Sequence, residues 1–356
     1  MTSLDNTDAI RRCDPSGMAR VIASFPRQCR DACCIVNGSD IPASYRRRYH
    51  NIVCAGLGGS AIGADIARSY LADEVKIPIF VNRNYTLPAF VGRNTLVIVS
   101  SYSGNTEETL SALRDARSRH ARIIAITSGG KLKEIAMSNS IPVVTIPPGL
   151  QPRAAIGYSL FTLLDVLSTT GVIGDRTKEA HEAIGLLEKM KDTMIGISVC
   201  SRKNIAKKLA RHMYRKIPVI YASQEHMDAV CTRWRGQLAE NAKTISSTHL
   251  FPEMTHNEIV GWEEPEKALK NLIAIILRDC GDHPRVSRRM DIVRKIIKSR
   301  GVEVIEVNSR GRGLLARILS LVYIGDYVSL YLAVLNGCDP TPVESIAYLK
   351  REVSRR

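Results

Sequence analysis

Short apolar, β-branched runs alternate with helical patterns along the first half of the chain. Helical patterns follow the first and third of these runs and extend to about Leu71 and Arg119. Strands that alternate with helices over short turns indicate right-handed crossovers and a parallel, doubly wound sheet. The runs predict five buried strands, at residues 51–56, 78–81, 95–100, 121–127 and 143–146.

The second half of the chain repeats this plan loosely. Its helical patterns cover residues 203–215, 225–241 and 283–300, its strand patterns cover 217–222, 271–278 and 302–307, and further helices run to Leu335. No hydroxyl-rich loop follows these later strands. We therefore expect a degenerate second copy that supplies a wall and catalytic groups.

The remaining stretches flank or join the two halves. Residues 1–15 look frayed, residues 16–34 read as helix, a long helix begins at Arg153, and residues 176–200 form an amphipathic helix. We predict an α/β protein with two doubly wound parallel-sheet subdomains and flanking helices. The predicted parts are an N-terminal helical segment (1–50), the first subdomain (51–172), a linker helix (173–202), the second subdomain (203–338) and a C-terminal helix (339–356).

Composition places the chain among soluble globular proteins. Of its 356 residues, 45% are hydrophobic and 24% are charged, which is ordinary for that class. The polar first residues do not resemble a signal peptide, and the best membrane candidate, 314–335, carries Arg317 and Asp326. The nine cysteines have no zinc-like spacing, so we expect reduced thiols, a cytoplasmic protein and no metal site.

The net charge of +15 indicates anionic partners without identifying them. Basic residues are spread along the chain, and 46–48 is the only triple run of arginine. No wider alternation of basic and aromatic residues suggests a surface for stacking bases. We predict neither a nucleic-acid partner nor a membrane partner.

A hydroxyl-rich loop follows the third predicted strand. Ser101, Ser103 and Thr106 surround Gly104, where the chain enters a helical pattern. The first N–H groups of a helix lack intrahelical partners and lie at its positive end, so added hydroxyl donors make an anion cradle. We expect it to hold the phosphate of a small molecule, although these residues could instead only cap the helix, for which one hydroxyl would suffice.

A glycine-rich turn follows the first predicted strand. Gly56, Gly58 and Ala61 satisfy a dinucleotide-type pattern, but that match alone is weak. A dinucleotide fold would place an acid after the next strand, which ends instead in 82–83, Asn-Arg. NAD is therefore disfavoured, as is NADP, although Arg83 could face a 2′-phosphate. Ser60 suits a second substrate contact or a simple helix cap.

Four other side chains are candidates for chemistry. Arg153 follows Pro152, so it could reach from a helix entrance toward the cradle. Glu240 ends a helical pattern, His256 lies in an irregular loop, and Lys350 closes an apolar C-terminal helix over 342–349. Each could equally be a solvated surface group on local pattern alone.

Six motifs follow one another in a fixed order along the chain. Together they resemble the bifunctional phosphoglucose/phosphomannose isomerase family, common in archaea and built from two sugar-isomerase (SIS) subdomains. The likeness covers about residues 18–350. The motifs are 56–63 (GLGGSAIG), 101–109 (SYSGNTEET), 152–158 (PRAAIGY), 240–243 (ENAK), 256–258 (HNE) and 339–343 (DPTPV).

This resemblance implies an aldose–ketose isomerase that interconverts fructose 6-phosphate with glucose 6-phosphate and mannose 6-phosphate. It implies that Glu240 moves the proton between C1 and C2, and that Arg153 stabilises the cis-enediolate. It also implies a homodimer in which His256 from the neighbouring subunit assists ring opening, while Lys350 contacts the ring-oxygen region. The implied substrate-binding residues are Gly59, Ser60, Ser101, Ser103, Thr106 and Thr341. No cofactor or metal is implied.

Two other interpretations stay open at this point. A sugar-phosphate-binding regulator would use the same domain, but residues 1–50 are short for a helix-turn-helix segment and contain Pro15 and Pro26. Another SIS-domain sugar-phosphate isomerase would usually be a single-domain chain. A glutamine-dependent aminosugar synthase is disfavoured because no glutaminase domain precedes the cradle.

Overall fold

The computed structural model describes residues 4–36 and 40–353. It begins with three short helices, α1 (Thr7–Cys13), α2 (Met18–Ala23) and α3 (Phe25–Ala32), and a 3₁₀ turn, η2 (Ala43–Tyr45). The expectation of a frayed start over 1–15 is wrong for α1, because Asn6 Oδ1 accepts hydrogen bonds from the backbone of Asp8 and Ala9 at 3.0 Å each. Residues 1–3 of that stretch, and 354–356 of the predicted C-terminal helix, lie outside the described residues.

The first sheet contains the five predicted strands, all parallel. Its order is β2-β1-β3-β4-β5, formed by β1 (Asn51–Ala55), β2 (Ile79–Asn82), β3 (Thr95–Ser101), β4 (Arg122–Thr127) and β5 (Val143–Thr145). Its helices are α4 (Gly59–Tyr70), α5 (Glu107–Ser118) and α6 (Gly130–Ser138). Strand order reverses at β1, so the loops after β1 and β3 diverge at a switch point, where open α/β sheets bind ligands.

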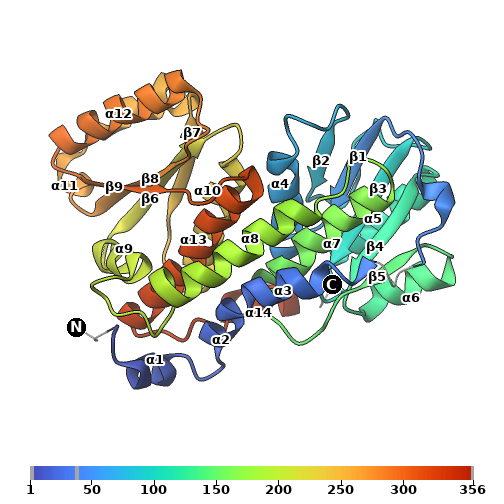
Figure 1. Ribbon diagram of the computed structural model, residues 1–356, viewed down its shortest axis with the longest axis horizontal. Helices are drawn as coiled ribbons and strands as arrows, with labels where there is room; N and C mark the ends of the chain where they lie inside the picture. Colours follow the sequence, from blue (N-terminus) through green and yellow to red (C-terminus); the bar gives the residue numbers. More distant parts are fainter. Residues whose placement is uncertain (1–3, 37–39, 354–356) are drawn as a thin grey trace.

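The second sheet lies at the opposite end of the molecule in Figure 1 and is also parallel. Its order is β7-β6-β8-β9, from β6 (Ile217–Ser223), β7 (Ser247–Phe251), β8 (Leu272–Arg278) and β9 (Glu303–Asn308). Its helices are α9 (Ile205–Met213), α10 (Asp228–Glu240), α11 (Glu266–Leu269) and α12 (Pro284–Ser299), with 3₁₀ turns η5 (Glu253–His256) and η6 (Glu258–Trp262). The two-sheet α/β prediction is therefore confirmed, while the exact boundaries of the five predicted parts stay a prediction.

The segment after α10 differs from expectation. The sequence pattern predicted no strand there and indicated a loop too irregular for the core, yet β7 pairs with β6, and Phe251, Met254 and Trp262 are buried. The apolar alternation is weak because β7 is an edge strand whose first four residues are exposed or half-buried, so backbone pairing rather than burial defines it.

Two helices in the middle of the chain are shorter than predicted. Arg153 lies in a 3₁₀ turn, η3 (Pro152–Ala154), and α7 (Ile156–Thr169) begins after Ala155, whose backbone leaves the helical region. The linker helix α8 (Thr177–Met190) ends in a π-helical turn, η4 (Lys191–Ile195), because Gly196 is extended. The predicted continuation to residue 200 is therefore wrong.

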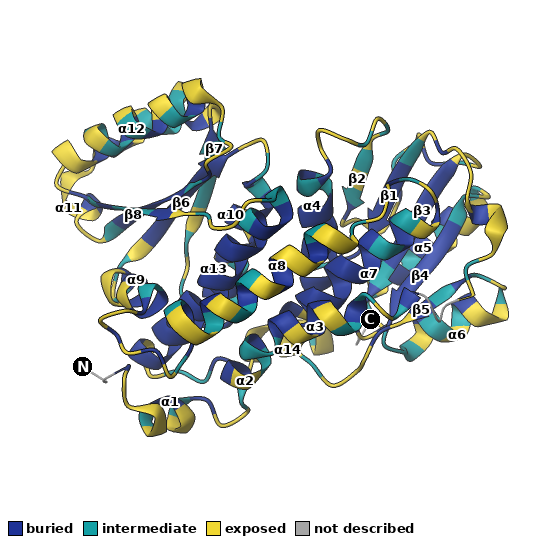
Figure 2. Cartoon of the chain, in the orientation of Figure 1, coloured by how far each residue is buried: buried dark blue, intermediate teal, exposed yellow. Residues whose placement is uncertain are grey.

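One long helix, α13 (Leu314–Asn336), replaces the several helices expected before Leu335. It passes between α8, α9 and α10, and Figure 2 shows it buried along its length. It is long and apolar enough to cross a membrane, but its apolar stretch is buried inside this protein, so it serves as the central core helix. The last helix, α14 (Glu344–Val353), buries none of its residues.

Candidate active site

The hydroxyl-rich loop after β3 meets the glycine-rich turn after β1. Ser101 Oγ lies 2.9 Å from Thr106 Oγ1, and the Tyr102 backbone N–H donates to Ser60 Oγ at 3.0 Å. Ser101 and Ser60 are buried, whereas the Ser103 side chain is exposed. Three of the predicted phosphate-binding residues are therefore brought together at the switch point, with Ser103 at its open side.

The hydroxyls of this loop do not cap the helices that follow. The N-cap of α4 is Gly58 and that of α5 is Thr106, and neither makes a side-chain capping hydrogen bond. Ser60 is already the second residue of α4. At the start of α4 the Ser60 and Ala61 N–H groups donate to the Leu57 and Gly58 carbonyls. The first N–H groups of α5 keep no such partner among the described residues, which is the property an anion cradle needs.

Close backbone contacts fix the cradle against its neighbours. Gly104 has φ +69°, and a Cβ there would lie 1.8 Å from the carbonyl oxygen of Gly129. A Cβ on Gly59 would lie 2.2 Å from the Pro152 carbonyl oxygen and 2.7 Å from the Arg153 nitrogen. Only glycine allows these approaches, so the start of α4 is packed directly onto the turn that carries Arg153.

Arg153 and Glu240 come together between the two subdomains. Arg153 Nη1 lies 3.4 Å from Glu240 Oε2. The Arg153 side chain is 4% exposed and that of Glu240 is 31% exposed, so the arginine is fixed and the carboxylate faces open space. Burial lowers the pKa of the Arg153 guanidinium, and the Glu240 carboxylate opposes that shift.

Two cavities share Glu240. A small one of about 150 Å³ runs from Gly58 and Gly59 past Arg153 to Glu240, with Arg83 and Arg235 also on its wall. Arg83 pairs with Asp65, which occupies the guanidinium that sequence reasoning considered for a 2′-phosphate. The larger one, about 690 Å³, extends from Glu240 over the end of α10 to the first turn of α14.

The other predicted residues lie farther from this pair. The Thr341 backbone carbonyl accepts a hydrogen bond from Arg153 Nη2 at 2.8 Å, so Thr341 adjoins the site. Lys350 is exposed on α14, one turn beyond Ile346, which lines the larger cavity. His256 is exposed at the carboxyl end of β7 and is not brought to Glu240 within this chain.

Comparison with known proteins decides the family. The chain is 46% identical over 303 residues to the bifunctional phosphoglucose/phosphomannose isomerase of Caldicellulosiruptor bescii, covering 85% of this chain and 89% of that protein. It is 39% identical over 308 residues to the enzyme of the same name from Aquifex aeolicus, covering 86% and 91%. The chain belongs to the bifunctional phosphoglucose/phosphomannose isomerase family.

Other matches agree with this membership in the isomerase family. Residues 202–353 match the bacterial phospho-glucose isomerase C-terminal SIS domain, and residues 47–141 match the SIS domain. A crystal structure of a glucose-6-phosphate isomerase like protein from Thermus thermophilus aligns with a TM-score of 0.63 at 21% identity, covering 96% of this chain and 99% of that one. At that identity the likeness supports the fold alone.

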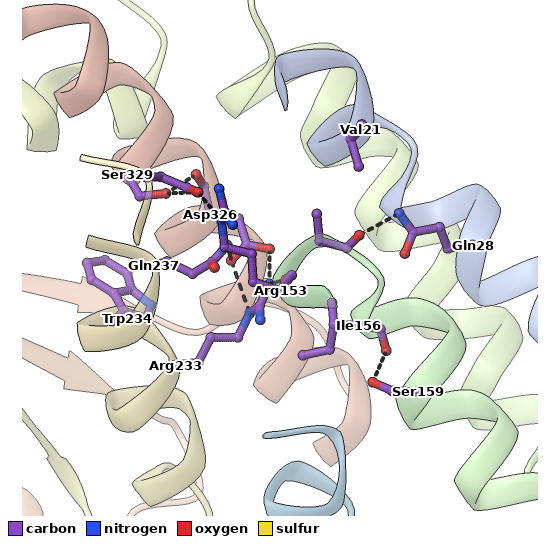
Figure 3. A network of polar contacts seen from close by, with 12 residues as sticks. Val21, Gln28, Arg153, Ile156, Ser159, Arg233, Trp234, Gln237, Asp326 and Ser329 are labelled. Carbon is purple, nitrogen blue, oxygen red and sulfur yellow. Dashed lines mark hydrogen bonds and ion pairs between the residues drawn. The ribbon is translucent and has the colours of Figure 1, made fainter. Parts of the chain in front are cut away.

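Several residues around Arg153 in this isomerase family member were missed from the sequence. Arg153 Nε donates to Asn241 Oδ1 at 2.7 Å, and Arg233 Nη2 donates to the Arg153 carbonyl at 3.0 Å. Arg233 in turn pairs with Asp326 of α13 at 2.8 Å (Figure 3). A signal was present: positions 233, 237 and 241 are polar at helical spacing, and Asp326 interrupts an apolar run.

The cysteines are unpaired throughout the part of the chain that the structure describes. In the same part, no three His, Cys, Asp or Glu side chains are grouped so as to hold a metal ion.

Proposed function

We propose that this protein interconverts fructose 6-phosphate with glucose 6-phosphate and mannose 6-phosphate. Membership in the family supports the reaction, since the curated relatives carry the name bifunctional phosphoglucose/phosphomannose isomerase. The observation that carries the proposal is the Arg153–Glu240 pair, 3.4 Å apart and packed through Gly59 onto an anion cradle. A base, a cation and a phosphate anchor are the groups that this reaction requires.

Proton transfer is the step we assign to Glu240. Isomerisation removes a weakly acidic proton beside a carbonyl, so it needs a positioned carboxylate and a positive group at the developing oxyanion. Glu240 would move the proton between C1 and C2, and Arg153 would stabilise the cis-enediolate. Accepting both aldoses follows if the planar enediolate can be reprotonated on either face or if the C2–C3 bond rotates. The side chains named here supply this chemistry without a metal ion.

The phosphate would lie in the cradle formed by Ser60, Ser101, Ser103 and Thr106. Their support is the uncapped start of α5 and the convergence of the Ser60, Ser101 and Thr106 hydroxyls. Binding energy from this remote phosphate would orient the reacting carbons toward Glu240. Gly59 holds the anchor and the arginine in contact.

His256 would act from a second copy of the chain. Glu240 ends α10, whereas His256 follows the carboxyl end of β7, on the side where α10 begins. The 13 residues of α10 span about 18 Å, so the two side chains stand at opposite ends of this unit. Exposed apolar residues on α14, including Tyr348 at 59% and Leu349 at 62%, support a homodimer.

Lys350 and Thr341 would complete the pocket. Lys350 lies on the same face of α14 as Ile346, which lines the larger cavity together with Val343 just before the helix, so its amine could reach the ring-oxygen region. Thr341 Oγ1 is buried without a hydrogen-bond partner among the described residues, which suits a side chain that lines a substrate site. We place the enzyme in the cytoplasm, in keeping with its unpaired cysteines in the described chain.

Coupled assays with each sugar phosphate test the function. Purified protein should convert fructose 6-phosphate to both aldose phosphates and should retain this activity after dialysis against a chelator. Absence of turnover with either aldose would contradict the proposal, and loss on chelation would contradict its metal-independent form. Sequence-selective DNA binding without turnover would instead favour a regulator.

A further inference from the structure

Most of the hydrogen-bond donors of the Arg153 guanidinium already have acceptors within the protein. Its Nη2 donates to the carbonyl oxygens of Pro340 and Thr341, each at 2.8 Å, and its Nε donates to Asn241 Oδ1 at 2.7 Å. A guanidinium has five N–H bonds. Three are therefore committed, one more points toward Glu240 at 3.4 Å, and a single N–H on Nη1 has no partner among the described residues.

Asn241 is the only side-chain amide in this set, and it is wholly buried. Its Oδ1 takes the Arg153 Nε hydrogen, while its Nδ2 donates to Ser329 Oγ at 2.9 Å. Ser329 Oγ donates in turn to the Asp326 carbonyl at 2.7 Å. Asn241 thus ties the arginine side chain to the central helix α13.

The same face of α10 is tied to α13 a second time. Arg233, Gln237 and Asn241 follow one another at intervals of four residues, and Figure 3 shows the first two directed at Asp326. Arg233 Nε, Arg233 Nη2 and Gln237 Nε2 donate to the Asp326 carboxylate at 3.1, 2.8 and 3.0 Å. The direction of α10, and with it the position of Glu240 at its end, is therefore fixed independently of Asn241.

We propose that Asn241 is a positioning residue for the isomerisation, one that turns Nη1 of Arg153 toward the substrate. Without an acceptor at Nε, only the two bonds at Nη2 would orient the guanidinium, so it could pivot about Nη2 and shift Nη1 relative to Glu240. Because the Arg233–Asp326 pair holds the backbone of α10 against α13, loss of Asn241 should disturb the arginine rather than the fold. The phosphate cradle lies at the starts of α4 and α5, whereas Asn241 bonds Arg153 and Ser329, so substrate anchoring should survive.

The test compares two variants at position 241 with two controls. Asn241→Asp is nearly isosteric but adds a carboxylate that competes with Glu240 for Arg153, and Asn241→Ala removes the acceptor. Ser329→Ala leaves the bond between Asn241 Oδ1 and Arg153 intact. Asn336→Asp makes the same chemical change at an exposed amide of α13 that bonds Ala242 and Thr244 but not Arg153.

We expect kcat with fructose 6-phosphate to fall about 10- to 100-fold in both Asn241 variants, less than the roughly 100- to 1,000-fold cost of losing a donor to a developing oxyanion, because Arg153 itself remains. KM and inhibition by inorganic phosphate should stay within about threefold of wild type, and the urea midpoint of Asn241→Asp should hardly move. Ser329→Ala and Asn336→Asp should keep kcat within about threefold. A fall in kcat with unchanged KM, phosphate inhibition and urea midpoint distinguishes a positioning role from a general loss of structure.

The inference rests on the proposed isomerase function, and the two can fail separately. A wild-type protein without turnover refutes the function and this inference with it. An active wild type whose Asn241→Asp variant keeps full kcat refutes the role of Asn241 alone, as does a fall in kcat matched by loss of phosphate inhibition. If Asn241→Ala does not fold, the contrast between Asn241→Asp and Ser329→Ala decides.

Discussion

Replacing Ser101 with alanine removes one hydroxyl from the proposed phosphate cradle. Ser101 is 1% exposed, and its Oγ contacts Thr106 Oγ1 at 2.9 Å and accepts from the Gly104 N–H at 3.1 Å. The Gly104 N–H also donates to the Ser101 carbonyl at 3.1 Å, so it keeps a partner in the variant. The fold should therefore lose only about 1 kcal/mol.

The loss of binding energy to the substrate phosphate should be larger than this loss of stability. A hydrogen bond to a charged group contributes about 1.5–3 kcal/mol, which corresponds to about a 10- to 150-fold fall in kcat/KM for fructose 6-phosphate. Inorganic phosphate should become a weaker inhibitor by a similar factor. Ser118→Ala is the matched control, because Ser118 ends α5, the helix after the cradle loop, and its Oγ donates to the Asp115 carbonyl at 2.9 Å, away from the cradle.

Steady-state kinetics with a coupled assay, together with phosphate inhibition and a urea unfolding curve, measure these quantities. Ser118→Ala should match wild type in all three. If Ser101→Ala keeps its kcat/KM and its phosphate inhibition, the cradle does not hold the phosphate. A parallel loss of stability of several kcal/mol would also refute the reasoning, since the hydroxyl would then serve the fold.

Three further predictions concern the scaffold. Asp326→Ala should destabilise the protein by about 3–5 kcal/mol in urea unfolding, because it leaves the buried Arg233 unpaired, whereas Lys270→Ala at an exposed pair should change little. Burial raises the pKa of Asp165 to about 7, so the folded state binds its proton more tightly than the unfolded state, and stability is lost as pH rises from about 4 to 7. Asp165→Asn should then stabilise the protein at pH 8, by at most about 2 kcal/mol after allowing for partial exposure, and not at pH 4; an equal gain at both pH values would contradict this. Gly59→Ala should lower kcat/KM at least about tenfold, because its Cβ would lie 2.2 Å from the Pro152 carbonyl oxygen, and unchanged kinetics would show that this contact can relax.

The sequence predicted the first sheet well because its central strands are buried apolar runs. β1 and β3 carry continuous apolar stretches that end in glycine or hydroxyl residues, so both the strands and the cradle loops could be placed from pattern alone. β7 could not, since its half-buried edge residues show no clear alternation and its pairing with β6 comes from the backbone. Local pattern predicts burial, not which strand will serve as a neighbour.

Only part of the candidate site was predicted, because local pattern does not show which distant residues meet. The approach of Arg153 to Glu240 came from resemblance, since 87 positions separate them and no local rule brings them within 3.4 Å. The partners of Arg153 were missed because two are backbone carbonyls, at Pro340 and Thr341, which carry no residue-type signal. Asn241 looked like an ordinary helix end, because its role depends on the packing of α10 against α13.

The most direct test of the central claim is the rate at which Glu240→Gln interconverts fructose 6-phosphate with both aldose phosphates. The substitution keeps the size of the side chain and removes the base, so phosphate inhibition and the urea midpoint should match wild type. We predict that both interconversions fall together by at least about a thousandfold, because one carboxylate moves the proton in each. If the variant keeps a tenth of the wild-type rate with either aldose, Glu240 is not the base.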